Sequence, residues 1–213
     1  MALKIVYEDK WLCLCIKEPG ILSEEGGMPE LLKQHSGKDH FCVHRLDRAV
    51  GGLMVYARDS RTAGKLSALV SNRDFEKEYL AIVHGKPESD SGVMRDLLFK
   101  DSSKNKSFVV KRMRKGVKEA ELEYELIKVC NDTSLVKIKL HTGRSHQIRV
   151  QFSSRSMPLL GDVKYGSTSK DCPIALWSHR LAFKHPVTGK IIDISENPPS
   201  DLPWTEFIGG QNG

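Results

Sequence analysis

Residues 118–141, KEAELEYELIKVCNDTSLVKIKLH, show most clearly the two-residue period of β-strands. Four glutamates alternate with apolar residues in the first half: Glu119, Glu121, Glu123 and Glu125. Successive side chains of a strand point to opposite faces, so this pattern predicts a half-buried strand. The second half alternates again after a turn at Asn131 and Asp132. This places Lys137 and Lys139 opposite the glutamates of an antiparallel hairpin.

The rest of the chain adds many strands and few helices. Strands are predicted at residues 4–9, 11–16, 41–46, 52–57 and 75–85, with two more within residues 175–195. Helices are predicted at residues 28–36, 60–73 and 144–154, the last two with N-caps at Ser60 and Thr142. Helices and strands do not alternate regularly, so we expect an α+β fold with a mixed, largely antiparallel central sheet flanked by helices. No linker-like stretch divides the chain, and residues 1–213 are expected to form a single domain.

The composition is that of an ordinary soluble globular protein, with 39% hydrophobic and 28% charged residues. The longest wholly apolar run, WLCLCI at residues 11–16, is far too short to cross a bilayer, and the first residues contain no signal-peptide core. A cytoplasmic protein with no membrane partner is therefore expected. The five cysteines lack the paired spacing of zinc sites, so core thiols are favoured over metal or redox roles.

The net charge of +6 is concentrated in one segment. Residues 100–118 hold eight Lys and Arg residues against one acid, which exceeds the surplus of the whole chain. We expect a basic insert or loop within the domain, and such a charge suggests a polyanionic partner, with RNA or DNA first. The alternative is a solvated loop without a partner. If the segment binds RNA, the candidate contacts are Lys111, Arg112, Arg114 and Lys115.

Three other segments combine apolar residues with groups that can do chemistry. Residues 43–59, VHRLDRAVGGLMVYARD, carry Asp47 in an apolar setting, where an ion is costly unless it is paired. Asp47 is thus a surface residue, half of a structural ion pair, or a catalytic group. Tyr79 lies in the strand-like KEYLAIVHG, and Arg149 in HTGRSHQIRV (141–150). An arginine so close to apolar residues usually has a carboxylate or phosphate partner.

Taken in order, these motifs resemble the RluA family of RNA pseudouridine synthases. The resemblance rests on V-H-R-L-D…G-L, K-x-Y-x-A-x-V-x-G, T-G-R-S-H-Q-I-R-V, P-L-L-G-D-x-x-Y-G and L-x-F-x-H-P-x-x-G. It covers nearly the whole chain, from about Ile5 to Trp204, and no S4-type RNA-binding domain is expected in front of it. The family implies one catalytic domain around a long antiparallel sheet, with the active site in a central cleft.

The resemblance also assigns roles to residues of this chain. It makes Asp47 the catalytic aspartate, Tyr79 the active-site tyrosine and Arg149 the arginine that pairs with the aspartate. The expected substrate-binding residues are His44, Arg45, which the family uses in opening the RNA, and Ile148, an apolar wall residue.

The chain departs from the family pattern directly after the aspartate. The family usually continues HRLD-x-x-Thr-Ser-Gly, whereas this chain has Val50, Gly51 and Gly52. Two hydroxyls that could brace the catalytic loop are therefore missing, and Gly51 is expected to add backbone freedom. The two glycines are also expected to let the chain turn tightly around Asp47.

The implied reaction converts a specific uridine of rRNA or tRNA to pseudouridine. It detaches uracil from N1 and rejoins it through C5, and neither a cofactor nor a metal is expected. The target nucleotide must be flipped into a pocket. Asp47 then attacks the nucleotide covalently or takes a ribose proton, and both routes stay open. Arg149 is expected to hold Asp47 charged and oriented, and Tyr79 to stack on the uracil rather than act as a base.

Two other functions compete with this one. A non-catalytic RNA-binding or ribosome-assembly factor would fit the departure at Val50 and Gly51, although Asp47, Tyr79 and Arg149 together speak against it. A glycosidase would need a second carboxylate, and no acid falls within a matching motif. No obligatory protein partner is evident, and a monomer is expected. Structural roles are predicted for the remaining polar residues: helix capping or RNA contacts for His141 and His146, and turns for Asp162 and His185.

Overall fold

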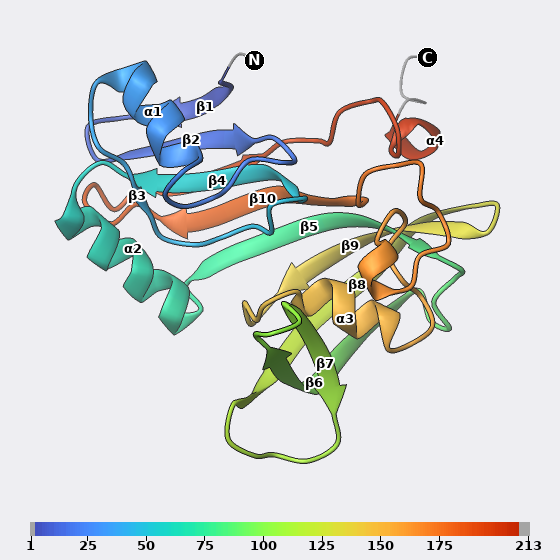
Figure 1. Ribbon diagram of the computed structural model, residues 1–213. Helices are drawn as coiled ribbons and strands as arrows, with labels where there is room; N and C mark the ends of the chain where they lie inside the picture. The colour runs from blue at the N-terminus through green and yellow to red at the C-terminus, as the bar shows by residue number, and fades with distance from the viewer. Residues whose placement is uncertain (1–2, 209–213) are drawn as a thin grey trace. The chain divides into compact units, whose positions relative to one another are not determined.

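The computed structural model describes residues 3–208 and divides the chain into two compact units. Of the described residues, the first unit comprises residues 3–77 and Trp177–Pro198, and the second comprises Glu78–Leu176 and residues 199–208. Two of the three boundaries fall inside strands, β5 (Phe75–His84) and β10 (Leu176–Lys184), and the third falls at Pro198 and Pro199, between β11 (Ile191–Ser195) and α4 (Thr205–Ile208). The predicted α+β class is confirmed, since strands dominate both units and helices are few (Figure 1).

The first unit is built on four strands in the order β1, β2, β4, β10 (Figure 1). Besides β10, these strands are β1 (Ile5–Glu8), β2 (Leu12–Lys17) and β4 (Gly51–Ala57). Two short strands are added beside β4 and β10: β3 (Phe41–Cys42) and β11 (Ile191–Ser195). Only β4 and β10 pair in parallel, and the other pairs in this unit are antiparallel. Every residue of β2 and β4 is buried, so these two strands form the core of the unit.

Two helices complete the first unit, α1 (Met28–Ser36) and α2 (Ser60–Asn72). The helix α1 has its predicted bounds. The N-cap of α2 is Asp59 and not the predicted Ser60, because the backbone at Asp59 is extended and its carboxylate accepts from Thr62 N and Thr62 Oγ1, both at 2.8 Å. The expected strand at residues 41–46 is also shorter, since only Phe41 and Cys42 pair with β4.

The second unit is an antiparallel sheet in the order β5, β9, β8, β6, β7. Its further strands are β6 (Ser91–Asp101), β7 (Lys106–Val110), β8 (Val117–Cys130) and β9 (Thr133–Leu140). The predicted hairpin is confirmed: Glu123 lies opposite Lys139 and Glu125 opposite Lys137. Lys137 Nζ and Glu125 Oε2 are 2.7 Å apart, which is the cross-strand attraction that the alternating charges predicted.

Three short helices accompany this sheet: α3 (Gln147–Ser153), the 3-10 turn η1 (Val163–Tyr165) and α4 (Thr205–Ile208). The helix α3 contacts β6 and β7. It begins at Gln147, later than predicted, and Thr142 is not its N-cap. The Thr142 hydroxyl instead donates to Gln147 Oε1 at 2.8 Å and accepts from the amide of Glu121 at 2.8 Å. None of the helices within residues 3–208 has the length and apolar character needed to span a membrane.

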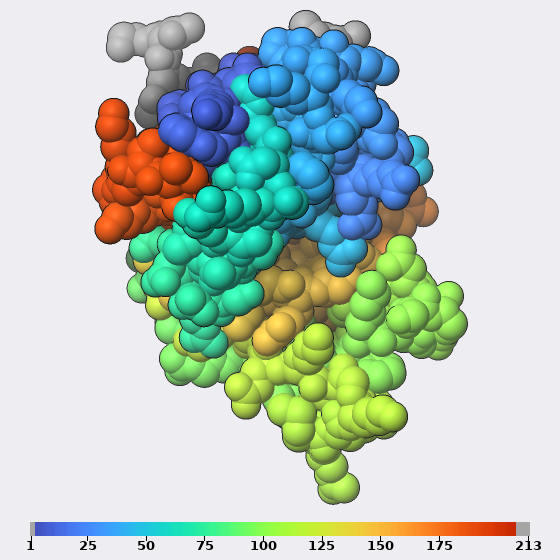
Figure 2. All heavy atoms as spheres, turned by 90° about the vertical axis from the view of Figure 1, so that its left-hand side faces the viewer, coloured from blue at the N-terminus to red at the C-terminus, as the bar shows by residue number. Residues whose placement is uncertain are grey.

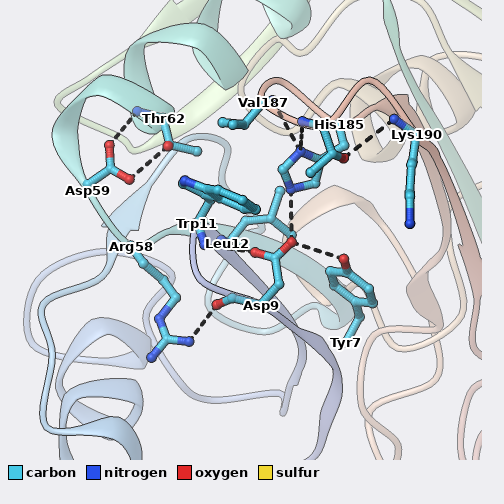
Figure 3. A network of polar contacts seen from close by, with 11 residues as sticks. Tyr7, Asp9, Trp11, Leu12, Arg58, Asp59, Thr62, His185, Val187 and Lys190 are labelled. Atoms are coloured by element: carbon cyan, nitrogen blue, oxygen red, sulfur yellow. Dashed lines mark hydrogen bonds and ion pairs between the residues drawn. The ribbon is translucent and has the colours of Figure 1, made fainter.

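A buried histidine ties the β1–β2 turn to the β10–β11 turn of the first unit (Figure 3). Nδ1 of His185 accepts from the amides of Val187 and Thr188, so Nε2 carries the proton and donates to Asp9 Oδ2 at 3.0 Å. The predicted turn role of His185 is thereby confirmed. The Asp9 carboxylate also accepts from the Tyr7 hydroxyl and from two backbone amides, those of Trp11 and Leu12. Burial raises the pKa of Asp9, but these hydrogen bonds outweigh it, and the pKa lies below its ordinary value.

The Asp9 carboxylate should therefore stabilise the fold in a pH-dependent way. Asp9→Asn is expected to lower the free energy of unfolding by about 1–3 kcal/mol at neutral pH, because hydrogen bonds to a charged acceptor are removed. Since the folded pKa is depressed, this contribution is present above the unfolded value of about 3.9 and is lost as the pH falls through the folded value. Urea unfolding should show the difference between wild type and variant shrinking on acidification. The exposed Asp90→Asn is the control, and a difference that does not change with pH would contradict this role.

Candidate active site

Asp47 is the first residue of a turn, and hydrogen bonds fix the residue directly before it. The amide of Val50 donates to the Asp47 carbonyl at 2.9 Å, so the turn comprises Asp47–Val50. The preceding Leu46 is fixed by Ser23, whose buried hydroxyl accepts from the Leu46 amide at 3.0 Å and donates to its carbonyl at 2.9 Å. The Asp47 residue itself is half-buried. The backbone around Asp47 is thus held in place, while part of the Asp47 residue stays accessible to solvent.

A buried lysine that the sequence patterns did not single out supports the other side of this turn. Lys17 lies at the end of β2, is fully buried, and donates through Nζ to the carbonyl of Arg48 at 3.2 Å. It donates further to two carbonyls of the loop after β2, those of Glu18 and Ile21. Burial lowers the pKa of Lys17 to about 8, and attraction to Asp47 and Glu18 opposes this fall. A lysine directly after the apolar run WLCLCI was the available signal.

The two glycines do not form the turn at Asp47. Gly51 and Gly52 lie in β4, beside Trp177 and Ser178 of β10. A Cβ on Gly51 would lie 2.6 Å from Cζ3 of the Trp177 ring, which is buried and held by a hydrogen bond from Nε1 to the carbonyl of Glu196. Gly52 has a φ of 120°, and a Cβ there would meet the backbone of Ser178. The predicted extra freedom of Gly51 is therefore wrong: the residue is small because an indole ring packs against it.

The two residues before Leu46 differ sharply in exposure. His44 is buried, its ring lies beside Phe75, and its Nε2 accepts from the amide of Val55 at 3.3 Å. Burial, together with the charge of Lys77, lowers the pKa of His44 to about 3, so the ring is neutral at physiological pH. Arg45 is exposed and pairs with Glu24 at 3.2 Å. Substrate contacts by His44 and Arg45 stay predictions. His44 also has a structural role, because its buried ring packs beside Phe75 and accepts from the amide of Val55.

In the second unit, Arg149 is bound by a buried carboxylate. Its Nε and Nη2 donate to the two oxygens of Asp162 at 2.7 and 2.8 Å, and its guanidinium lies over the ring of Tyr165, 5.0 Å from the centroid. Both members of the ion pair are buried. Arg149 thus has a carboxylate partner in Asp162, which the sequence analysis did not name for it. Asp162 also fills its predicted turn role, since its carbonyl accepts from the amides of Tyr165 and Ser167.

Two other predicted site residues are buried in the same unit. Tyr79 lies in β5 opposite Ile138 of β9 and is 5% exposed. Ile148 is the second residue of α3 and is 4% exposed. Asp47 belongs to the first unit, whereas Tyr79, Ile148 and Arg149 belong to the second. The predicted pairing of Asp47 with Arg149 therefore stays a prediction.

The two histidines near Arg149 have partners other than metals. Nδ1 of His146 lies 2.8 Å from the Tyr165 hydroxyl, and Nε2 of His141 lies 2.9 Å from Glu123 Oε1. His146 is the N-cap residue of α3, with a left-handed backbone, although its side chain makes no capping bond. Across residues 3–208, no three His, Cys, Asp or Glu side chains come together as metal ligands would.

The basic segment at residues 100–118 is more ordered than the predicted insert or loop. It contains the end of β6, the whole of β7 and the start of β8, joined by two turns. The four candidate RNA contacts lie in the exposed turn between β7 and β8: Lys111, Arg112, Arg114 and Lys115.

Comparison with known proteins identifies the class of enzyme. The model of the RNA pseudouridylate synthase family matches residues 15–154, which include Asp47, Tyr79 and Arg149. The chain therefore belongs to the RNA pseudouridylate synthase family, and the prediction that it is an enzyme of this kind, an isomerase, is confirmed.

Curated relatives and solved structures agree with this assignment. The "Ribosomal large subunit pseudouridine synthase C" of Buchnera aphidicola subsp. Schizaphis graminum is 32% identical, over 96% of this chain and 69% of its own. The "Dual-specificity RNA pseudouridine synthase RluA" of Haemophilus influenzae is 30% identical, over 94% of each chain. A structure titled "Human RNA Pseudouridylate Synthase Domain Containing 4" matches with a TM-score of 0.78 at 24% identity, covering 92% of this chain and 88% of that one. This last likeness concerns the fold.

The packing of Trp177 on Gly51 predicts the cost of restoring the family's usual residue. Gly51→Ser is expected to lower the free energy of unfolding by about 1–3 kcal/mol, because the new side chain overpacks against a buried ring. Urea unfolding measures this loss. Ala49→Ser, at an exposed position of the same loop, should change stability by less than about 0.5 kcal/mol. A Gly51→Ser protein as stable as wild type would show that Trp177 can move aside.

Proposed function

We propose that this protein isomerises a uridine of ribosomal or transfer RNA to pseudouridine, with Asp47 as the catalytic carboxylate. The observation that carries the proposal is the setting of Asp47 within the matched family segment. The residue is half-buried in a turn whose neighbours are fixed by Ser23 and Lys17. A carboxylate that was merely exposed to solvent would not need a turn fixed by these hydrogen bonds, whereas a catalytic group must be held in a productive geometry.

The reaction needs few groups beyond this carboxylate. The bond between ribose C1′ and uracil N1 breaks, and a bond between C1′ and C5 forms. The proton on C5 leaves to solvent and N1 gains one, so every heavy atom of the product comes from the substrate. Asp47 attacks the nucleotide covalently or removes a ribose proton, and both routes suit a fixed carboxylate. No cofactor is part of this proposal.

Arg149 is proposed as the cationic partner of Asp47. Asp162 engages the Nε and Nη2 edge of the guanidinium and fixes its plane, and Tyr165 lies against its face. A guanidinium has five N–H donors, and pairing with Asp47 would use the Nη1 side. Tyr79 is proposed to offer its ring to the uracil. His44, Arg45 and Ile148 stay proposals as substrate-binding residues.

A non-catalytic factor with the same fold is less well supported. Its basis was the replacement of the usual Thr-Ser by Val50 and Gly51. The packing of Trp177 on Gly51 gives that replacement a local structural reason. The Buchnera relative, by its name, acts on the large ribosomal subunit, which supports rRNA as one substrate class to test first.

Tritium release tests the catalytic role of Asp47 directly. Ribosomal and transfer RNA transcripts carrying tritium at uracil C5 should lose label to water on incubation with the wild-type protein. Asp47→Asn is expected to release no label above background, since it removes the charge and leaves the shape. Asp90→Asn, an exposed residue of the second unit, is the matched control and should release label at the wild-type rate. Release by Asp47→Asn, or its absence with wild type on every transcript, would overturn the proposal.

Arg149→Met should abolish turnover and leave RNA affinity within a few fold of wild type. The reason is that the guanidinium orients the carboxylate and contributes little to holding the RNA. Because this change leaves the Asp162 carboxylate buried without its cation, Arg149→Lys serves as a second variant that keeps the charge but not the planar, bidentate geometry. Arg149→Lys should fold, as judged by circular dichroism, and turn over slowly. The exposed Arg95→Met is the control, and an active Arg149→Met enzyme would exclude the pairing.

A further inference from the structure

Residues 100–118, called here the basic arm, form the most strongly charged part of the surface. The arm holds eight Lys and Arg residues and one acid. Seven of the eight basic residues are exposed, and Lys106 is half-buried. In Figure 2 the arm is the yellow-green part of the second unit that projects at the lower end of the view. Such a concentration of one sign of charge costs free energy unless a partner neutralises it.

Within the described part of the chain, no carboxylate pairs with the basic side chains of the arm. The arm's own acid, Asp101, is used to close the β6–β7 turn, where its Oδ1 accepts from the amides of Ser103 and Lys104. Two basic residues elsewhere on the same sheet are paired, Arg95 with Glu121 at 2.9 Å and Lys137 with Glu125 at 2.7 Å. The arm therefore keeps its positive charge for a partner outside the chain.

The backbone of the arm is also anchored at its strand β7 (Lys106–Val110). Its strand β7 pairs with β6 along its whole length. The amide of Ser107 donates to the Tyr165 hydroxyl at 2.8 Å, and the Ser107 hydroxyl donates to the carbonyl of Ser145 at 2.7 Å. An ordered backbone loses less conformational entropy on binding than a disordered loop would, which suits a partner with a regular array of negative charges.

The one aromatic residue of the arm, Phe108, and the neighbouring Phe99 each have a cation over the ring. Arg114 lies over the ring of Phe99, which borders the arm, at 5.1 Å, and Lys106 lies over the ring of Phe108 at 5.8 Å. Proteins that bind single-stranded RNA rely on open aromatic faces for base stacking. A cation over one face of each ring leaves less of the ring open for stacking, and the cations greatly outnumber the rings, so the arm is better suited to phosphates than to bases.

The basic residues are divided between the two ends of β7. Lys104 lies in the turn before this five-residue strand, and Lys111 begins the turn after it. Five residues of a strand span about 16 Å, so the two ends can meet separate rows of phosphates. Double-stranded RNA presents such rows and is recognised through its shape and backbone rather than its bases.

We propose that the basic arm binds the phosphate backbone of a base-paired RNA stem. This proposal rests on the proposed function only in taking RNA as the substrate. It adds that the arm binds the base-paired part of that RNA. The arm would supply affinity that is independent of sequence and sensitive to salt, while the chemical step stays with other residues.

Binding of plain RNA probes tests the proposal without turnover. The arm variant carries Lys111→Gln, Arg112→Gln, Arg114→Gln and Lys115→Gln. The matched control removes the same charge at exposed lysines elsewhere: Lys10→Gln, Lys38→Gln, Lys170→Gln and Lys190→Gln. The probes are a blunt RNA duplex of about 20 base pairs and an unstructured single strand of equal length, each long enough to span several phosphates. Fluorescence anisotropy at several salt concentrations gives the affinities and their salt dependence.

The arm variant should bind the duplex at least tenfold more weakly than wild type and the single strand less than threefold more weakly. Its plot of log affinity against log salt should be shallower by about 0.9 for each phosphate that the arm no longer neutralises. Duplex affinity within twofold of wild type would overturn the proposal, as would an equal weakening for the single strand or an equal weakening in the control variant. The duplex requires no turnover, so failure here is distinct from an absence of tritium release, which would instead overturn the proposed function.

Discussion

Both units are organised around charges that are buried and therefore need partners inside the protein. An ion removed from water is tolerated only when oppositely polarised groups surround it. The ammonium of Lys17 meets three backbone carbonyls, and the guanidinium of Arg149 meets both oxygens of Asp162. Neither arrangement is local, since Lys17 reaches Arg48 and Arg149 reaches Asp162 only when the chain is folded. The same hydrogen bonds fix the backbone next to Asp47 and the plane of the Arg149 side chain, so stability and the proposed chemistry depend on the same bonds.

The sequence predicts well those elements whose side chains alternate or whose ends carry unambiguous signals. The hairpin of β8 and β9 follows from the two-residue period of residues 118–141, and α1 has the bounds predicted for it, where the structure adds a capping box at Glu30 and a left-handed Gly37. The starts of α2 and α3 were predicted less well: adjacent residues can cap α2, and the start of α3 was placed too early in the chain. Asp59 rather than Ser60 caps α2, because the backbone at Asp59 is extended. The helix α3 starts only at Gln147, whose side chain accepts a hydrogen bond from the Thr142 hydroxyl. Such choices depend on backbone angles that residue types alone do not determine.

The site could be predicted only as far as its motifs reach. HRLD and TGRSHQIR select Asp47 and Arg149 as candidates, and the family resemblance named Asp47 as the partner of Arg149, whereas the bidentate contact of Arg149 with Asp162 is a fact of geometry that no motif showed. Asp162 was expected in a turn, where its backbone does lie, while its side chain performs a second task. The role of Lys17 was not predicted, for a different reason. A lysine at the end of an apolar strand is normally exposed, and its burial follows from carbonyls contributed by two separate loops.

The departure from the family pattern after Asp47 illustrates how one packing interaction changes the meaning of a sequence. Two missing hydroxyls suggested a looser loop, because hydroxyls often brace turns. In this chain the turn is braced from outside, by the Ser23 hydroxyl on one side and the Lys17 ammonium on the other. The position after Val50 is then free to be small, and the Trp177 ring fills the space that a side chain would need. Replacing the hydroxyls therefore need not loosen the turn, and the departure gives no argument for a protein that has lost its chemistry.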